Sequence, residues 1–202
     1  MIYPNKWEVS FLTSATRDEV EKASSWVKHA NKIINDYFGI ITSFDVIICR
    51  GRWEMEVQVI SRKSQSLFSM YSDTKFVGIT DYRLGEIVIR CDIARFGHYL
   101  HELLHGIISN KHPHQLREGF AWYFTLKLTE GYRYVRPSYP SWVDTLYIYP
   151  VNRLAAIVGD EFLKDLAVGK ASIQYDLLPR DVQDLFLSEE VFYAKKRYLK
   201  RE

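Results

Sequence analysis

Hydrophobic residues recur at three- and four-residue steps between Thr16 and Gly39, which is the spacing of one face of an amphipathic helix. These apolar positions are Val20, Ala23, Val27, Ala30, Ile34 and Phe38. Thr16 and Glu19 are spaced as in a capping box, where each side chain accepts a hydrogen bond from a backbone N–H of the first turn. Gly39 suits a left-handed cap at the other end. The pattern therefore predicts a helix over residues 17–38.

The pattern changes after this helix to short runs rich in β-branched and aromatic residues, which are typical of strands. Residues 44–49 and the largely alternating residues 53–60 predict one hairpin. Residues 76–80 and 86–90 bracket a turn and predict a second hairpin. Because these connections are short for a crossover, we expect the strands to pair in an antiparallel or mixed sheet.

The remainder of the chain is predicted to be largely helical. Residues 92–109 place their apolar side chains on one side of a helix, and residues 116–129 are apolar almost all round. Later segments are an expected Tyr- and Pro-rich loop at 132–150, helices near 151–157 and 160–168, and a basic amphipathic helix at 189–202. This order of elements indicates an α+β fold. We expect one domain over residues 1–202, with a helix-and-sheet lobe at 1–96 and a helical lobe at 97–202.

Composition and charge limit the expected partners. The 202 residues are 47% hydrophobic and include 27 Lys+Arg against 25 Asp+Glu, a formal charge of +2. This balance supplies no strong field for nucleic acid or an anionic membrane, so we expect neither as a partner. Cys49 and Cys91 are too few for a disulfide framework and are expected to be small buried residues. Since the sequence shows no secretory signal, we expect a cytoplasmic protein, with export by a non-classical route left open. We also expect the protein to act as a monomer.

Residues 101–105, His-Glu-Leu-Leu-His, carry the most specific chemical pattern in the chain. Two histidines four residues apart project from one helix face and can bind the same zinc ion. Glu102 can then take a proton from an activated water and return it to a leaving amine. His98 lies on the same side of the helix, but we expect it to support the site or to be exposed rather than to bind metal. A pair of core histidines without metal is the alternative interpretation.

A catalytic zinc usually has three protein ligands and one open position, so the two histidines need a third ligand. The position of the third histidine in metzincins is taken here by Lys111. His112 and His114, in a Pro-containing loop, are two alternatives. Glu118 is preferred, because residues 116–129 are predicted to be a helix and would place this carboxylate in the first turn, where the helix dipole favours an anion.

A His-Glu-x-x-His motif followed by Glu-x-x-Ala on a second helix resembles the gluzincins, the thermolysin-like and aminopeptidase N-like zinc peptidases. Residues 116–123, Leu-Arg-Glu-Gly-Phe-Ala-Trp-Tyr, are similar to the aminopeptidase N sequence Leu-Asn-Glu-Gly-Phe-Ala-x-Tyr. The resemblance implies a zincin-like metallopeptidase domain. It also implies that His101, His105 and Glu118 bind zinc and that Glu102 is the general base.

The resemblance further implies how a peptide or protein substrate binds. A strand before the site offers its edge to the substrate backbone, and residues 86–90 take that place. Tyr149, or else Tyr147, corresponds to the tyrosine that supports the oxyanion. The aminopeptidase signature Gly-x-Met-Glu-Asn is absent, which favours an endopeptidase over an exopeptidase. Only the twelve residues 106–117 separate His105 from Glu118, fewer than is usual in those families.

Two other functions stay open at this point. A zinc peptidase dedicated to one cellular protein, as in the repressor-cleaving regulators related to ImmA and IrrE, also pairs this motif with a downstream acidic ligand. A catalytically inactive protein with a zincin fold could instead use its hairpin edge and basic C-terminal helix to bind a partner. Metal content and activity on an unstructured protein separate these alternatives.

Overall fold

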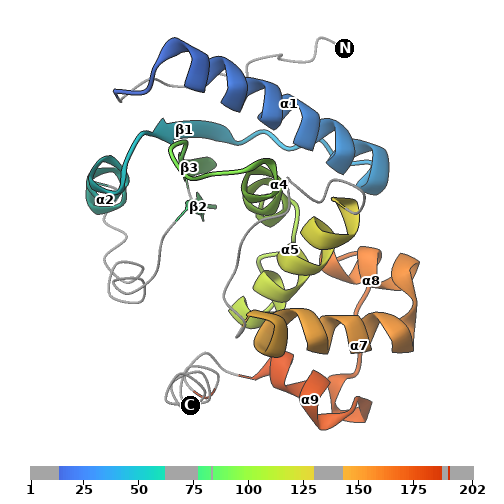
Figure 1. The fold of residues 1–202 in the computed structure, drawn as a ribbon. Helices are drawn as coiled ribbons and strands as arrows, with labels where there is room; N and C mark the ends of the chain where they lie inside the picture. Colours follow the sequence, from blue (N-terminus) through green and yellow to red (C-terminus); the bar gives the residue numbers. More distant parts are fainter. Residues whose placement is uncertain (1–13, 62–76, 83, 130–142, 188–190, 192–202) are drawn as a thin grey trace. The chain divides into compact units, whose positions relative to one another are not determined.

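The computed structural model describes residues 14–61, 77–82, 84–129, 143–187 and 191. The chain forms two compact units, the first made of residues 1–106 with 134–137 and the second of residues 107–133 with 138–202. The first unit holds a small mixed sheet with helices, and the elements described in the second are helical (Figure 1). The predicted α+β class is therefore confirmed.

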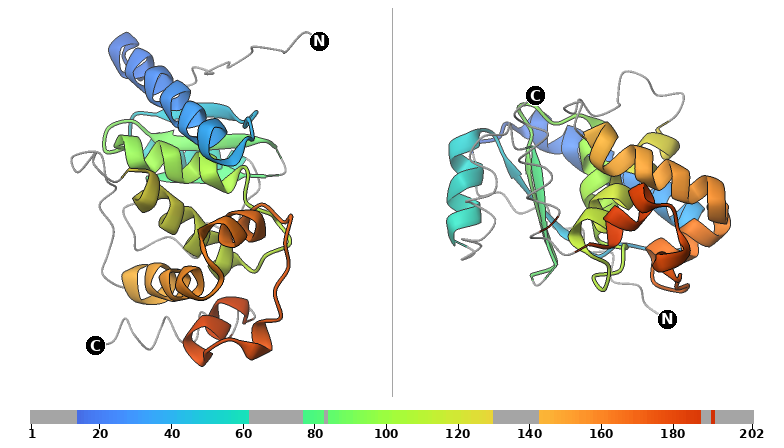
Figure 2. Two further views of the ribbon diagram at one scale, coloured as in Figure 1. Left: turned by 90° about the vertical axis from the view of Figure 1, so that its right-hand side faces the viewer. Right: turned by 90° about the horizontal axis from the view of Figure 1, so that it is seen from below.

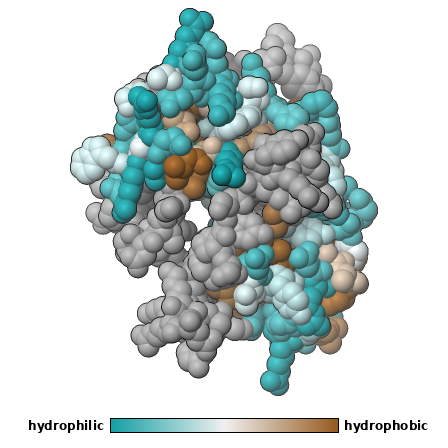
Figure 3. All heavy atoms as spheres, viewed as in Figure 1, coloured by the Kyte–Doolittle hydropathy of each residue, from teal (hydrophilic) through white to brown (hydrophobic). Residues whose placement is uncertain are grey.

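Helix α1 (Arg17–Phe38) begins and ends at the predicted residues. The Thr16 hydroxyl accepts the Glu19 N–H at 3.3 Å, and the Glu19 carboxylate accepts the Thr16 N–H at 2.7 Å. Gly39 closes the helix with a φ of 67°, in the left-handed region. The predicted apolar positions are all buried, and hydrophilic residues cover the outer side of α1 in the space-filling view (Figure 3). Local signals thus determine this helix completely.

The sheet contains β1 (Asp45–Cys49), β2 (Gly78–Asp81) and β3 (Glu86–Arg90) in the order β1-β3-β2. Strands β2 and β3 are antiparallel and form the predicted second hairpin. Strands β1 and β3 are parallel, with Ile47 opposite Val88. The sheet is therefore mixed, as expected. Its parallel pair of strands is joined by a crossover, which the sequence analysis did not expect because the connections are short.

The crossover contains α2 (Arg52–Ser61), a helix where the alternating sequence predicted a strand, so the first predicted hairpin is wrong. Met55 is buried, at 2% exposure, whereas Trp53 is 74% exposed and Val57 is also exposed. Met55 packs in a cluster with residues on one face of the sheet, namely Ile47, Cys49, Val88 and Ile79. Met55 anchors α2 to the sheet, and an Arg52–Glu56 ion pair of 2.6 Å links successive turns of the helix. Neither contact requires the alternating pattern of a strand.

The opposite face of the sheet is covered by α4 (Phe96–His105), which contacts both β2 and β3 (Figure 2). Helix α4 is shorter than the predicted 92–109 and ends at His105, with Gly106 as its C-cap. Helix α1 packs against α4 through two aromatic contacts, Trp26 with Tyr99 at 5.4 Å and His29 with Phe96 at 5.1 Å between ring centroids. The sheet and α1 together fix α4 from two sides.

The second unit is built on α5 (His114–Leu128), which matches the predicted second helix. The other elements are the π-helix η2 (Asp144–Ile148), α7 (Tyr149–Val158), α8 (Asp160–Ala167), η3 (Tyr175–Leu177), α9 (Arg180–Gln183) and η4 (Asp184–Phe186). The two later helices are confirmed, whereas residues 144–150 of the expected loop are helical. A Cβ on Gly119 would lie 2.7 Å from Val151, so this glycine allows α5 and α7 to approach closely.

Three further predictions concern cysteines, the C-terminus and membranes. Both cysteines are free, and only Cys49 is fully buried, because Cys91 is half-buried at the end of β3. The predicted helix at 189–202 lies outside the described residues, except for Val191. No helix among the described residues is long and apolar enough to cross a membrane.

Candidate metal centre

Three residues of the motif on α4 have buried side chains. His101, Glu102 and His105 are 7%, 8% and 6% exposed, respectively. The apolar residues of the helix pack in the core around them, namely Phe96, Tyr99, Leu100, Leu103 and Leu104. A buried charged group needs a compensating partner, so three polar side chains in this setting indicate a site rather than ordinary core packing.

The two histidine rings of α4 point their Nε2 atoms at one another. These atoms are 3.2 Å apart, and the rings meet edge to face with centroids 4.8 Å apart. A tetrahedral zinc with Zn–N bonds of about 2.0–2.1 Å requires its nitrogen ligands to be about 3.3 Å apart. The spacing of His101 and His105 therefore fits two ligands of one zinc. The same spacing also allows a hydrogen bond between two neutral rings in the metal-free protein.

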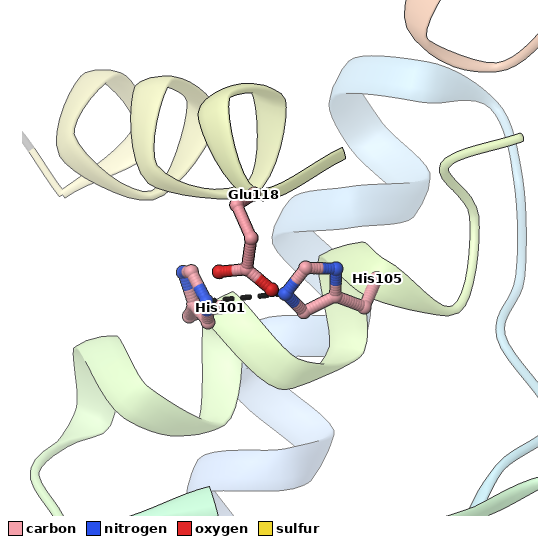
Figure 4. Close-up of side chains that lie close together, drawn as sticks. All are labelled: His101, His105 and Glu118. Carbon is pink, nitrogen blue, oxygen red and sulfur yellow. Dashed lines mark hydrogen bonds between the residues drawn. The ribbon is translucent and has the colours of Figure 1, made fainter. Parts of the chain in front are cut away.

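Glu118 on α5 completes a group of potential metal ligands with the two histidines. One ligand atom from each of His101, His105 and Glu118 lies within 4.8 Å of the others. Figure 4 shows the Glu118 carboxylate directed toward the two imidazole rings. Two imidazoles and one carboxylate are a donor set found in catalytic zinc sites. Because α5 begins at His114, Glu118 is its fifth residue, and the expectation that it lies in the first turn is wrong.

The two alternative third ligands are placed differently. The Nε2 atom of His112 lies 2.7 Å from the Leu166 carbonyl oxygen, and its ring packs against Phe120 with centroids 5.6 Å apart. Burial lowers the pKa of His112, and the hydrogen bond to the carbonyl offsets this only in part. His114 is the first residue of α5. The group of ligand atoms found in the structure contains Glu118 and neither of these histidines.

His98 has a structural role at the start of α4. Its Nδ1 atom accepts the backbone N–H of Arg95 at 2.9 Å, which satisfies a donor at the helix terminus. Burial lowers the pKa of His98 to about 4, and the neighbouring His101 contributes in the same direction. The group of candidate metal ligands found among the described residues does not include His98.

Two residues of β2 that the sequence analysis did not identify lie against Glu102. The Thr80 hydroxyl lies 2.8 Å from Glu102 Oε2 and 3.0 Å from the Glu102 carbonyl oxygen. A Cβ on Gly78 would lie 2.7 Å from both Cγ and Oε1 of Glu102. The predicted hairpin could have revealed this pair, because residues two apart on a strand share one face.

The open edge of the sheet is also different from the predicted one. Residues 86–90 form β3, which is hydrogen-bonded to a strand on each side, so the expectation that they pair with substrate is wrong. Within the described residues, β2 pairs with β3 alone and has one edge without a partner strand. Tyr82 follows β2 and meets the His105 ring edge to face, with centroids 6.4 Å apart. Strand β2 therefore lies beside both Glu102 and His105.

The two tyrosines considered for oxyanion support differ in environment. Tyr147 is 3% exposed and belongs to a hydrophobic cluster with Val143, Leu146 and Ile148. Tyr149 is the first residue of α7 and is 55% exposed. Tyr147 packs in the core, and a role of either tyrosine in supporting the oxyanion stays a prediction.

Comparison with known proteins adds no relative: no protein-family model matches the chain, and no curated protein or solved structure matches it significantly. The functional interpretation therefore rests on the residues and distances described above.

Proposed function

We propose that this protein is a zinc-dependent peptidase, of the endopeptidase type, with a zincin-like active site. In this proposal His101, His105 and Glu118 bind the zinc ion and Glu102 is the general base. The observation that carries the proposal is the set of three ligand atoms within 4.8 Å of one another, next to a buried glutamate on the same helix as two of them. Three protein ligands leave a coordination position for water or substrate.

The proposed chemistry divides between the metal and Glu102. When bound, zinc supplies Lewis acidity, which acidifies water and polarises a carbonyl group. Glu102 accepts a proton from the attacking water and then delivers it to the nitrogen of the leaving amine as the peptide C–N bond breaks. This role requires Glu102 to be ionised and correctly oriented at the start of the reaction. The Thr80 hydroxyl lies 2.8 Å from Glu102 Oε2, within hydrogen-bond distance of the carboxylate.

The proposed substrate is an extended peptide segment. Among the strands that the structure describes, β2 pairs on one edge alone. Its other edge can accept a substrate backbone as an additional strand, which gives affinity with little dependence on the substrate sequence. Strand β2 also holds Glu102, so a peptide bound along it would pass close to the general base. An extended substrate that continues past the site in both directions is cut internally, in accordance with an endopeptidase.

The decisive experiment is the substitution Glu102→Gln, with zinc content and cleavage of β-casein measured on the same preparations. We expect one zinc per chain in both proteins, and loss of cleavage only in the variant, because an amide cannot accept the proton. Glu21→Gln is a matched control on the exposed face of α1, where Glu21 is paired with Arg17. Cleavage by Glu102→Gln at the wild-type rate would refute the assignment.

The same measurements separate the other interpretations. A wild-type protein that binds one zinc tightly but leaves β-casein intact would favour a peptidase dedicated to one folded substrate. Substantially less than one zinc per chain, with no change in the melting temperature on adding zinc, would favour a protein without metal chemistry.

A further inference from the structure

We infer that strand β2 positions the general base, with Thr80 orienting the Glu102 carboxylate and Gly78 leaving the space that the carboxylate needs. This inference rests on the proposed function, in which Glu102 takes up the proton. Thr80 is thus a positioning residue, which acts through Glu102 and not on the substrate. The Thr80 hydroxyl connects the sheet directly to the motif, through both the carboxylate and the carbonyl oxygen of Glu102.

The sheet register determines which residues of β2 meet α4. Gly78 lies opposite Ile89 and Thr80 opposite Ile87, while Ile79 packs in the cluster on the other face with Val88. Side chains alternate along a strand, so Gly78 and Thr80 must both face α4 when Ile79 faces α2. A shift of one residue would move Thr80 to the wrong face. The hairpin register and the orientation of Glu102 are therefore linked.

The hydrogen bond from Thr80 selects one arrangement of a flexible side chain. A glutamate on a helix has several rotamers of similar energy, and fixing it costs conformational entropy. The Thr80 hydroxyl donates to Oε2 at 2.8 Å, and an ionised carboxylate is a stronger acceptor than the carbonyl at 3.0 Å. The bond to Oε2 leaves lone pairs on the carboxylate for the water proton. The entropy cost is thereby met by the fold before substrate binds.

Gly78 is explained by the same contact. Glycine in a strand is unfavourable in itself and often marks a close approach of another group. A Cβ here would lie 2.7 Å from Glu102 Cγ and Oε1 and 2.9 Å from Cδ, closer than any normal contact. Even alanine at this position would displace the carboxylate or the strand. Gly51 offers a matched comparison, since a Cβ there meets nothing within 4 Å.

The test compares Thr80→Val, Thr80→Ser, Gly78→Ala and the control Gly51→Ala as zinc-loaded proteins on β-casein peptides. We expect Thr80→Val and Gly78→Ala to lower kcat about 10- to 100-fold, the usual effect of losing a residue that orients a site. KM, zinc content and the far-UV circular dichroism should stay at wild-type values. Thr80→Ser restores the hydroxyl and should recover most of kcat, and Gly51→Ala should match wild type. Wild-type kcat in Thr80→Val would overturn the inference.

A second measurement does not depend on activity. In zinc-free protein, melting temperatures are compared for Thr80→Val, Glu102→Ala and the double variant. If Thr80 and Glu102 are coupled, the shift of the double variant will be smaller than the sum of the two single shifts. Additive shifts would overturn the inference even if the protein is a peptidase. Non-additive shifts in a protein that cleaves nothing would instead contradict the proposed function and preserve the contact.

Discussion

Helices α4 and α5 both carry candidate zinc ligands, but they fix these ligands in different ways. On α4, His101 and His105 are four positions apart, so that one helix face brings their Nε2 atoms to 3.2 Å. Glu118 is the single candidate ligand on α5, and its distance to the histidines depends on tertiary structure. A local pair is insensitive to changes elsewhere in the chain, whereas a ligand brought by a second helix is sensitive to the packing of that helix.

The two helices also differ in which of their side chains are buried. Helix α4 has buried polar residues on one side and apolar residues on the other. Helix α5 is buried chiefly through packing positions, with Gly119 against Val151 and with Phe120, Ala121 and Phe124 fully buried. Most of the α5 sequence is therefore determined by the core of the second unit. Variants on the two helices should accordingly separate direct effects on the metal from effects on packing.

The largest effect is expected from His105→Ala, which removes one member of the local pair. Zinc supplies several kcal/mol of transition-state stabilisation, so its loss should lower kcat/KM to below about a thousandth of wild type. Zinc content measured after gel filtration should fall well below one per chain. Retention of one tightly bound zinc by this variant would show that the α4 pair is not the metal site.

A smaller effect is expected from Glu118→Gln, which keeps the shape of the side chain and removes its charge. Because a neutral amide oxygen is a weaker ligand, zinc affinity should fall roughly a hundredfold, or about 2.8 kcal/mol. Competition with a chromogenic chelator measures this affinity. His114→Gln is the matched control and should retain wild-type affinity. The reverse result, with the effect on His114, would transfer the role of third ligand to the first residue of α5, an alternative that the sequence left open.

The contrast between local and tertiary determination also explains which predictions succeeded. Helix α1 was predicted to the residue because the capping box, the apolar face and Gly39 are all local signals. The alternating residues 53–60 predicted a strand, but they form a helix that buries Met55 against the sheet. The parallel pairing of β1 with β3 decides whether residues 53–60 form a strand or a helix, and no pattern within these residues indicates that pairing.

The candidate site divides in the same way. His101, Glu102 and His105 were identified from their spacing, and Glu118 from a resemblance in the following helix. The contact of Thr80 with Glu102 spans 22 residues and depends on the register of β2, so it has no signature in either motif. The substrate edge was assigned to residues 86–90 because strand order cannot be read from strand positions alone. Pairwise geometry across the sheet was therefore the missing information.

Alanine substitutions at two glycines, one beside α4 and one on α5, compare how tightly these helices are packed without changing a candidate ligand. A Cβ at Gly106, which follows α4, would lie 2.5 Å from the ring of half-buried Phe44 and 3.1 Å from the Leu103 carbonyl oxygen. A Cβ at Gly119 would meet buried Val151 at 2.7 Å and the Tyr147 carbonyl oxygen at 3.3 Å. Overpacking costs about 1–3 kcal/mol, so we expect Gly119→Ala at the upper end and Gly106→Ala at the lower.

Urea unfolding of zinc-free protein measures both changes. Equal destabilisation by the two variants would indicate that Phe44 is held as rigidly as the core of the second unit. A larger loss for Gly106→Ala would contradict the comparison, because it would make the end of α4 the more tightly packed of the two positions.

The smallest predicted effect is a pH dependence from His112, just before α5. Burial lowers the pKa of His112, so the unfolded chain takes up a proton at a higher pH than the folded protein. Stability should therefore be complete above the unfolded value of about 6.5 and should decline as the pH falls below it. One histidine can contribute at most about 1.4 kcal/mol per pH unit.

His112→Gln keeps a donor for the Leu166 carbonyl and should flatten this decline. Urea unfolding in the presence of a chelator, at about pH 7.5 and about pH 5.5, measures the difference without interference from zinc binding. A decline of the same slope in the variant would assign it to other groups, of which His98 beside α4 is the first to examine, since burial lowers its pKa to about 4.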